Sequence, residues 1–410
     1  QYFMKTAEKI LDNNSDKSYL LTSLDARNFK LINERFGHIV GDQTLMNIAK
    51  NIKSKFHKNG LYARSQSDSF LILVEDTSQN RELLKSLVDL DISIHNTTNY
   101  KVPLKIGVCP IPRYNPALSL SLYIDRANIA KKYTSARNTN YICYFTDDMN
   151  KKLNMKNMIE SEMVRALSKG EFVVYYQPKY ELANDTIIGA EALVRWNHKE
   201  KGIISPGVFI PVFERNGFIV DLDFYVYEQV LKMQKHRLDM GKKVIPISMN
   251  VSRCHLSDTN FVDKLEAVVA KYKVPKQYIE MEITESIFSQ EDSSAIALIY
   301  NLKEHGFTIS MDDFGSAYSS LNLLRKVQID TLKIDKVFID STEDVQRSQV
   351  IVEEIINMAS KIHVKTICEG VETQSQRDFL KNAGCNMVQG YFYSKPLPYE
   401  DFSDLLNSSK

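Results

Sequence analysis

Residues 278–313 decide the fold, and they read YIEMEITESIFSQEDSSAIALIYNLKEHGFTISMDD. The apolar run at 278–283 predicts a strand, residues 294–304 have helical spacing, and residues 308–311 predict a second strand that ends in two aspartates. A strand, a helix and a strand in this order predict a βαβ unit with two parallel strands. The carboxyl ends of both strands then lie at the same edge of the sheet.

The same alternation extends over residues 150–410. The predicted strands are 172–177, 189–194, 244–250, 278–283, 308–311, 331–334, 366–368 and 387–389, and the predicted helices are 223–238, 261–272, 294–304, 347–362 and 374–382. Eight strands with intervening helices over ~250 residues indicate an α/β fold of the TIM (βα)8 barrel type. The first two strands are joined by a short polar segment, residues 182–188, so we expect a modified barrel that begins with an antiparallel hairpin.

Residues 1–149 have a different pattern. The predicted strands are 19–25, a strand around Tyr62, 70–74, 102–108 and 141–145, and the predicted helices are 45–56, 83–90 and 124–132. Two adjacent strands flanked by helices favour an α+β domain of the ferredoxin or cyclase kind. Residues 147–157 are polar and rich in Lys, Asn and Met, so we place the boundary there and predict domains 1–149 and 150–410.

The composition excludes several functions. The 410 residues carry 52 Lys and Arg against 51 Asp and Glu, and the net charge of +1 gives no global field to attract polymeric nucleic acid or a membrane surface. No apolar run approaches the ~20 residues that cross a bilayer. The five cysteines are scattered without a CxxC pair, as expected in a reducing cytosol. The chain begins at Gln1 without a signal-peptide pattern, so we expect a cytoplasmic fragment of a longer sensor protein, with a membrane-anchored sensor as one alternative.

Polar residues interrupt the barrel pattern wherever an apolar strand run ends. These residues are Glu191, Asn250, Glu282, Asp312, Asp313, Lys333, Glu369 and Gln389. Any one of them alone is more often a solvated loop residue or a helix cap. Because strand ends carry the active site of a βα barrel, and seven strands give the same pattern, we expect these side chains to converge on one mouth.

So many carboxylates in one place would repel one another unless cations were bound. Oxygen ligands without His or Cys favour Mg²⁺ or Mn²⁺ over zinc, and the adjacent Asp312 and Asp313 suit two ions. Two ions roughly 3.5–4 Å apart clamp the attacking and leaving oxygens of phosphoryl displacement, which predicts phosphodiester or phosphomonoester hydrolysis. Lys333 would complement charge on the phosphate or orient the water. Arg195 would bind a phosphate oxygen, or else form a structural salt bridge.

Nine short motifs follow one another in the second domain. They are YYQP at 175–178, EALVRW at 191–196, FIPVFE at 209–214, MNVS at 249–252, EITE at 282–285, DDFG at 312–315, KID at 333–335, EGVE at 369–372 and QGY at 389–391. Each motif is weak alone, but their order and spacing together are highly specific. From Met158 to the C-terminus the chain resembles the EAL family of cyclic di-GMP phosphodiesterases.

The resemblance implies a site with two metal ions, a cyclic di-GMP substrate, the linear product pGpG and a homodimer. By the resemblance, one ion would be held by Glu191, Asn250, Glu282 and Asp312, and the other by Asp312, Asp313 and Glu369. Lys333 and Gln389 would position the water, Glu372 joins the catalytic set, and Gln177, Arg195 and Asp223 match positions that contact the dinucleotide.

The resemblance also gives a role to the loop after the aspartate pair, residues 313–320. Glu285 matches the glutamate that braces this loop, which in the family links the site to the dimer interface. Ala317 stands where glycine is usual. An alanine at a position that needs positive φ would strain the loop.

The first domain resembles the GGDEF diguanylate cyclase family with its chemistry removed. The matching residues are Phe29, Lys30, Asn33, Gly37, His38, Gly41, Asp42 and 125–132. The signature loop instead reads RSQSDSF at 64–70, and Arg27 replaces a second aspartate beside the surviving Asp25. Without the loop glycines and the acid, triphosphate approach and one metal ligand are lost, so we expect no cyclase activity. The family's inhibitory RxxD site is also missing at 57–60.

Alternatives remain for both domains. The barrel is expected to be a metal-dependent phosphodiesterase, with a non-hydrolysing cyclic di-GMP receptor as the main rival and a scaffold for missing domains as the third interpretation. Receptors of that kind usually lack an acid or the lysine, and all are present here. The first domain would be a scaffold, or a regulatory GTP pocket in which Asn33 and Asp42 bind the guanine nucleotide and helix 158–167 transmits binding to the barrel.

Overall fold

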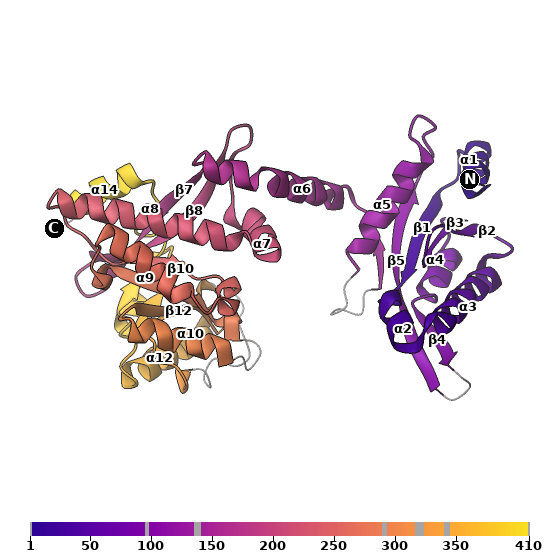
Figure 1. The fold of residues 1–410 in the computed structure, drawn as a ribbon. Helices are drawn as coiled ribbons and strands as arrows, with labels where there is room; N and C mark the ends of the chain where they lie inside the picture. Colours follow the sequence, from indigo (N-terminus) through magenta and orange to yellow (C-terminus); the bar gives the residue numbers. More distant parts are fainter. Residues whose placement is uncertain are drawn as a thin grey trace. The chain divides into compact units, whose positions relative to one another are not determined.

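The computed structural model describes residues 2–94, 98–134, 141–288, 293–315, 324–339 and 345–408. The chain divides into two compact units, residues 1–157 and 158–410 (Figure 1). Each unit has its own sheet and its own hydrophobic core. The units are therefore described separately.

The first unit is an α+β domain built on a mainly antiparallel sheet, in which β6 pairs with β5 in parallel. Its strands run in the order β2-β3-β1-β5-β4, with β6 beside β5. The strands are β1 (Tyr19–Ala26), β2 (Gly60–Arg64), β3 (Ser69–Glu75), β4 (Asp89–Ile94), β5 (Thr98–Ile111) and β6 (Ile142–Tyr144). The helices are α1 (Tyr2–Asn13), α2 (Phe29–Phe36), α3 (His38–Phe56), α4 (Ser78–Lys85) and α5 (Leu120–Lys132).

The central strand β1 is buried on both faces because side chains alternate along a strand. Leu20 and Leu24 pack in one core with α2, α3 and α4. Tyr19 and Leu21 pack in a second core with α1 and α5. A layer of helices on each face explains why β1 reads as a nearly continuous apolar run.

One prediction in this unit is wrong. The sequence predicted a helix at 83–90, but α4 ends at Lys85 and β4 begins at Asp89. The helix begins earlier because the side chain of Thr77 caps it and accepts a hydrogen bond from the backbone N–H of Asn80, at 3.1 Å. β4 then pairs with β5, a tertiary contact that local apolar spacing does not specify.

The polar segment at 147–157 is helical, and no loop separates the two units there. Helix α6 runs from Asp147 to Ser168, so the boundary between the two units along the chain falls inside this helix. Asp147 and Asp148 in its first turn complement the positive end of the helix dipole. The segment contains neither Gly nor Pro, so nothing in it ends the helix.

The second unit is a closed barrel, as the sequence predicted. Its strands are β7 (Phe172–Glu181), β8 (Thr186–His198), β10 (Ile247–Asn250), β11 (Ile279–Thr284), β12 (Thr308–Phe314), β13 (Thr331–Ile334), β14 (Lys365–Cys368) and β15 (Met387–Val388). Neighbours from β10 to β15 are parallel, and pairing of β10 with β8 closes the ring. β7 is antiparallel to both β8 and β15, so the predicted hairpin at the start of the barrel is confirmed.

Helices surround this ring. They are α7 (Pro206–Asn216), α8 (Ile219–Asp239), α9 (Phe261–Tyr272), α10 (Ser293–Glu304), α12 (Val345–Lys361), α13 (Gln374–Asn382) and α14 (Tyr399–Ser408). The sequence did not predict α7 and α14. Strand β11 shows how the barrel is oriented: Met281 and Ile283 pack in the core, whereas Glu280 and Glu282 reach residues on strands across the ring. Alternation along the strand thus places polar side chains inside the barrel.

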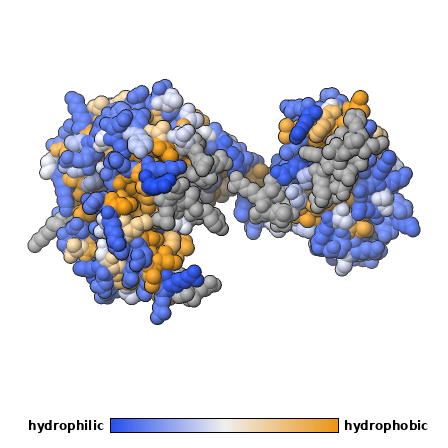
Figure 2. Space-filling view, turned by 90° about the horizontal axis from the view of Figure 1, so that it is seen from below, coloured by the Kyte–Doolittle hydropathy of each residue, from blue (hydrophilic) through white to orange (hydrophobic). Residues whose placement is uncertain are grey.

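On the face seen in Figure 2, hydrophilic residues cover much of each unit, and hydrophobic residues are also exposed on the larger unit. Within the described ranges, no helix is both long and apolar enough to cross a membrane. All five cysteines lie in the described part of the chain, and none of them forms a disulfide there.

Candidate active site

The barrel brings the predicted acids together around one lysine. Lys333, on β13, is only 1% exposed. Its Nζ lies 2.6 Å from Oε1 of Glu369 and 3.0 Å from Oδ1 of Asp312. It lies 3.5 Å from Oε2 of Glu191 and also pairs with Oε1 of Glu282. Since these acids lie on or directly after four different strands, closure of the barrel is what collects them.

Amide side chains complete the ring. Gln389 follows β15, and its Nε2 donates to Oε2 of Glu191 at 2.7 Å and to Oε1 of Gln177 at 3.1 Å. Asn250, the last residue of β10, makes a long contact of 3.5 Å from Nδ2 to Oε1 of Glu191. Gln389 is held close to the acids by its neighbour Gly390, where an added Cβ would lie 2.2 Å from the backbone oxygen of Val371.

The aspartate pair is held by an unusual turn at the end of β12. The backbone N–H of Asp313 donates to Oδ1 of Asp312 at 2.9 Å, and Asp313 has φ 55°, in the left-handed region. Oε2 of Glu285 accepts a hydrogen bond from the backbone N–H of Gly315 at 2.8 Å. The side chain assigned to brace the loop therefore contacts its start. Ala317 and its effect on the loop lie outside the described residues.

Burial and mutual repulsion shift the titration of these acids. Burial raises the pKa of Asp312 to about 9, and the charges of Glu369 and Glu191 add to this effect. Burial, together with Asp335, raises the pKa of Asp313 to about 6. Burial also acts to raise the pKa of Glu191, but nearby ammonium groups, first that of Lys333, hold that pKa below its ordinary value.

The residues fit a hard divalent metal. Oxygen atoms of Glu191, Glu282 and Glu369 lie within 4.8 Å of one another. Among the described residues, two buried oxygens at the site, Oε2 of Glu282 and Oε1 of Gln389, have no hydrogen-bond partner. Carboxylate and amide oxygens of this kind are the ligands of Mg²⁺ and Mn²⁺. Of these three acids, Glu191 and Glu282 were expected to hold one ion and Glu369 the other.

The residues expected to contact a dinucleotide do not form one group. Gln177 lies beside the acids, where its Oε1 accepts the hydrogen bond from Gln389. Arg195 is half-buried, its Nη1 donates to the backbone oxygen of Val194 at 2.9 Å, and its guanidinium carbon lies 5.7 Å from the ring centre of Tyr175. The loss of solvent on burial lowers the pKa of Arg195. Its guanidinium stacks on an aromatic ring, so no salt bridge is needed to hold it.

Asp223 shares a cavity of about 90 Å³ with Arg195 and Asn250. Its Oδ2 lies 2.9 Å from Nε2 of His255 and accepts a weaker hydrogen bond of 3.4 Å from the backbone N–H of Ser252. Burial raises the pKa of Asp223, and His255 opposes that effect. Asp223 is therefore held by its own chain beside this small cavity.

Glu372 is exposed at the start of α13, and its backbone N–H donates to Oε1 of Gln376. The sequence analysis missed other polar residues near the acids, namely Lys179, Glu280, His255 and Asp335. Lys179 directly follows the YYQP motif, and Asp335 ends the KID motif, so their positions carried a usable signal. His255 lies outside any of the motifs.

In the first unit, the surviving Asp25 is already paired. Nζ of Lys131 contacts Oδ1 of Asp25 and donates to Oγ of Ser23 at 2.9 Å. The hairpin loop that replaces the signature closes on itself, because the backbone N–H of Ser65 donates to the oxygen of Ser69 at 2.8 Å. These contacts give the cyclase-like loop a compact turn of its own.

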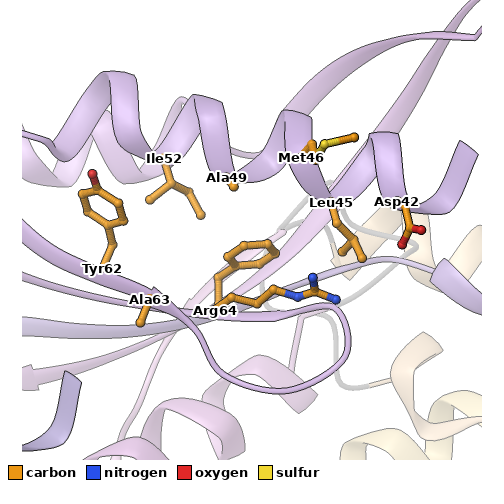
Figure 3. Close-up of a pocket in the computed structure, with 9 residues that line it drawn as sticks. Asp42, Leu45, Met46, Ala49, Ile52, Tyr62, Ala63 and Arg64 are labelled. Atoms are coloured by element: carbon orange, nitrogen blue, oxygen red, sulfur yellow. The ribbon is translucent and has the colours of Figure 1, made fainter. Parts of the chain in front are cut away.

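A cavity of about 600 Å³ lies between α3 and the hairpin of β2 and β3 (Figure 3). Its lining residues are Asp42, Leu45, Met46, Ala49, Ile52, Tyr62, Ala63, Arg64 and Phe70. Most of the wall is apolar, and Asp42 and Arg64 supply two opposite charges. Asn33 is not among the lining residues; its side chain lies over Gly41, where an added Cβ would meet Oδ1 at 1.9 Å.

The second unit is a closed α/β barrel with a ring of acid and amide side chains. These features define a class of α/β barrel proteins that have a site for a hard metal ion. Residues 160–396 match the family model described as "EAL domain", and residues 1–139 match "Diguanylate cyclase, GGDEF domain". The chain therefore belongs to the EAL domain family and carries a GGDEF domain in front.

Two curated relatives align with most of the chain. The bifunctional diguanylate cyclase/cyclic di-GMP phosphodiesterase MucR of Pseudomonas aeruginosa is 28% identical over 94% of this chain and 56% of the relative. The cyclic di-GMP phosphodiesterase PdeR of Escherichia coli is 30% identical over 92% of this chain and 57% of the relative. The chain thus spans about half the length of the curated relatives it matches.

Solved structures resemble the barrel unit. The PaMucR phosphodiesterase in complex with c-di-GMP is 32% identical, with a TM-score of 0.57 over 60% of this chain and 99% of that structure. An EAL domain protein from Listeria monocytogenes is 28% identical, with a TM-score of 0.53 over 60% of this chain and 96% of that structure.

Proposed function

We propose that the barrel hydrolyses cyclic di-GMP to linear pGpG with two Mg²⁺ or Mn²⁺ ions. The observation that carries the proposal is the ring of four acids around Lys333, with Gln389 and Gln177 beside it. The names of the relatives MucR and PdeR and the c-di-GMP complex of a similar barrel support the choice of substrate. In this reaction, water adds across one phosphodiester bond and opens the ring.

The charge balance of the barrel interior supports two ions. The acids at the site, beside it and one layer below it are Glu191, Glu280, Glu282, Asp312, Asp313, Asp335 and Glu369, and the cations are Lys179 and Lys333. Seven carboxylates against two ammonium groups leave five negative charges when all are ionised. Two divalent cations would neutralise four of these charges, whereas without metal the charge is reduced by raised pKa values such as that of Asp312.

Each residue then has a role in the reaction. We assign Glu191, Asn250, Glu282, Asp312, Asp313 and Glu369 as metal ligands. The ions would polarise the phosphate and lower the pKa of the attacking water. Lys333 and Gln389 would orient that water through their N–H groups. Gln177 would contact the dinucleotide, and Arg195 would bind a phosphate oxygen, with its guanidinium fixed over Tyr175.

The test is chromatography of cyclic di-GMP after incubation with the chain and Mg²⁺ or Mn²⁺. We expect pGpG from the wild type, and loss of product with EDTA and with Glu191→Gln, which keeps the side-chain size. Glu304→Gln, at an exposed acid at the end of α10, is the matched control and should retain activity. If cyclic di-GMP is bound but remains intact under all conditions, the chain is a receptor and the hydrolase proposal is wrong.

We further propose that the first unit makes no cyclic di-GMP. Two observations support this: Asp25 is neutralised by Lys131, and the loop at 64–70 lacks the glycines that let a backbone approach a triphosphate. Incubation of the Glu191→Gln variant with GTP and Mg²⁺ isolates this unit, since the barrel then cannot consume product. Accumulation of cyclic di-GMP in that variant would overturn the proposal.

We also propose that the chain is a homodimer. Exposed apolar side chains are present on α12 and on η4 (Lys336–Phe338), two elements that contact each other: Val337, Val345, Val350 and Ile351. Light scattering should give twice the chain mass, and Val350→Asp should shift the mass towards that of a monomer. A monomeric mass for the wild type at micromolar concentration would contradict the proposal.

A further inference from the structure

A second polar layer lies inside the barrel, one step below the acids. Its residues stand two positions before the site residues on their strands: Ser248 before Asn250, Glu280 before Glu282, and Ser310 before Asp312. All three are buried, with Ser248 and Ser310 fully so. Branched apolar side chains usually fill this part of a βα barrel, so a polar layer here calls for a partner that compensates its burial.

For Glu280 that partner is Lys179, on β7, whereas Oγ of Ser248 has no hydrogen-bond partner among the described residues. Lys179 is 2% exposed, and its Nζ lies 3.3 Å from Oε1 of Glu280. Ser310 donates its hydroxyl to the same oxygen of Glu280. β7 is the one antiparallel strand of the ring, and it places Lys179 opposite Gly189, two positions before the site residue Glu191 on β8. The lysine thus belongs to the second layer.

Lys179 also reaches up to the site. Its Nζ lies 3.8 Å from Oε2 of Glu282, an oxygen that has no hydrogen-bond partner among the described residues. The other oxygen of Glu282 pairs with Lys333 in the layer above. Glu282 therefore lies between two ammonium groups, one on each side of its carboxylate.

We propose that Lys179 is a positioning residue that orients Glu282 for metal binding, with Glu280 and Ser310 holding the lysine in place. The inference rests on the proposed function, because it assigns Glu282 as a metal ligand. Residues that hold a metal-ligating side chain typically change metal affinity roughly 10- to 100-fold when they are removed. An ion pair that only fills the barrel would leave metal affinity unchanged, since a buried pair can be replaced by neutral groups without loss of the fold.

The test removes the pair without changing the net charge. Lys179→Met with Glu280→Gln deletes one positive and one negative charge, and Gln at 280 can still accept from Ser310. Mn²⁺ affinity is measured by isothermal titration calorimetry on the full chain, with circular dichroism to verify folding. We expect binding roughly 10- to 100-fold weaker than in the wild type. The matched control, Lys271→Met with Glu228→Gln, deletes a surface pair of 2.7 Å and should bind like the wild type.

A second variant covers the case in which methionine prevents folding. Lys179→Gln with Glu280→Gln keeps hydrogen bonding inside the barrel, and the same loss of affinity is expected. Wild-type Mn²⁺ affinity in either folded variant would overturn the role of Lys179. If the wild type binds Mn²⁺ but hydrolyses nothing, the proposed reaction fails while the affinity difference still supports Lys179. If the wild type binds no Mn²⁺, both proposals fall.

Discussion

The two units use acids in opposite ways. In the first unit, Asp25 has one cation, Lys131, directly against it, so the charges balance within the protein. In the barrel, one ammonium group, that of Lys333, contacts four carboxylates. An acid at a strand end therefore does not by itself indicate a metal site. A group of buried carboxylates that outnumbers the neighbouring ammonium groups does, because the protein has too few cations of its own to balance the negative charge.

The two units also differ in how a loop is placed relative to the polar residues. In the barrel, Gly390 lets the backbone after β15 approach Val371 closely and keeps Gln389 at the acids. In the first unit, serines occupy the hairpin at 64–70, which hydrogen bonds to itself. The barrel therefore keeps the backbone after β15 close to its acids, whereas the hairpin of the first unit closes a turn on itself.

The largest effect is expected from Lys333→Met. In the proposed reaction Lys333 orients the water, so its loss should lower kcat by roughly 10²- to 10⁴-fold. Four carboxylates also lose their shared cation, so the thermal midpoint in EDTA should fall, and Mn²⁺ should raise it more than in the wild type. Chromatography of pGpG and thermal denaturation with and without Mn²⁺ measure the two effects.

Lys326→Met, at an exposed lysine of the same unit, is the control and should change neither quantity. If Lys333→Met keeps both wild-type turnover and wild-type stability in EDTA, the contrast between the crowded acids of the barrel and the paired Asp25 of the first unit is wrong.

The next effect is a dependence of stability on pH in the metal-free barrel. Burial raises the pKa of Asp312 to about 9, so the folded state holds a proton there that the unfolded state, with a pKa near 3.8, has released. The unfolded state thus binds fewer protons over this range, and the free energy of unfolding falls as pH rises, by at most about 1.4 kcal/mol per pH unit. Urea unfolding in EDTA between pH 5.5 and 8.5 measures the slope.

Asp312→Asn removes this proton and should flatten the slope. Saturating Mn²⁺ should flatten it in the wild type, because bound cations favour the ionised carboxylate. Equal slopes in EDTA for wild type and variant would show that the proton on Asp312 is not linked to folding.

The sequence predicted the barrel well for a physical reason. Parallel strands covered on both faces read as apolar runs, and most site residues stand near or directly after the end of a run, whereas Glu191 lies in the middle of β8. Every predicted barrel strand overlaps one in the structure, and Glu191, Glu282 and Lys333 meet as expected. Strand alternation does not say which residues meet across the ring, so the contact of Lys179 with Glu280 was missed.

Other misses came from contacts distant in sequence. His255 and Asp223 are 32 positions apart and meet only because α8 packs beside the turn after β10. Likewise, the end of α4 depends on pairing of β4 with β5 rather than on its own apolar residues. These features need the tertiary fold, which no local pattern contains.

The smallest expected effect concerns the first unit, whose cavity between α3 and the hairpin could still bind GTP through Asp42. GTP at ten times its Kd would stabilise this unit by about 1.4 kcal/mol, or roughly 3–6 °C in its thermal midpoint. Asp42→Asn should abolish the shift, because the amide cannot accept both guanine N–H groups, whereas Asp12→Asn on α1 should keep it. No shift with millimolar GTP would rule out the nucleotide pocket and leave the first unit as a scaffold without a ligand of this class.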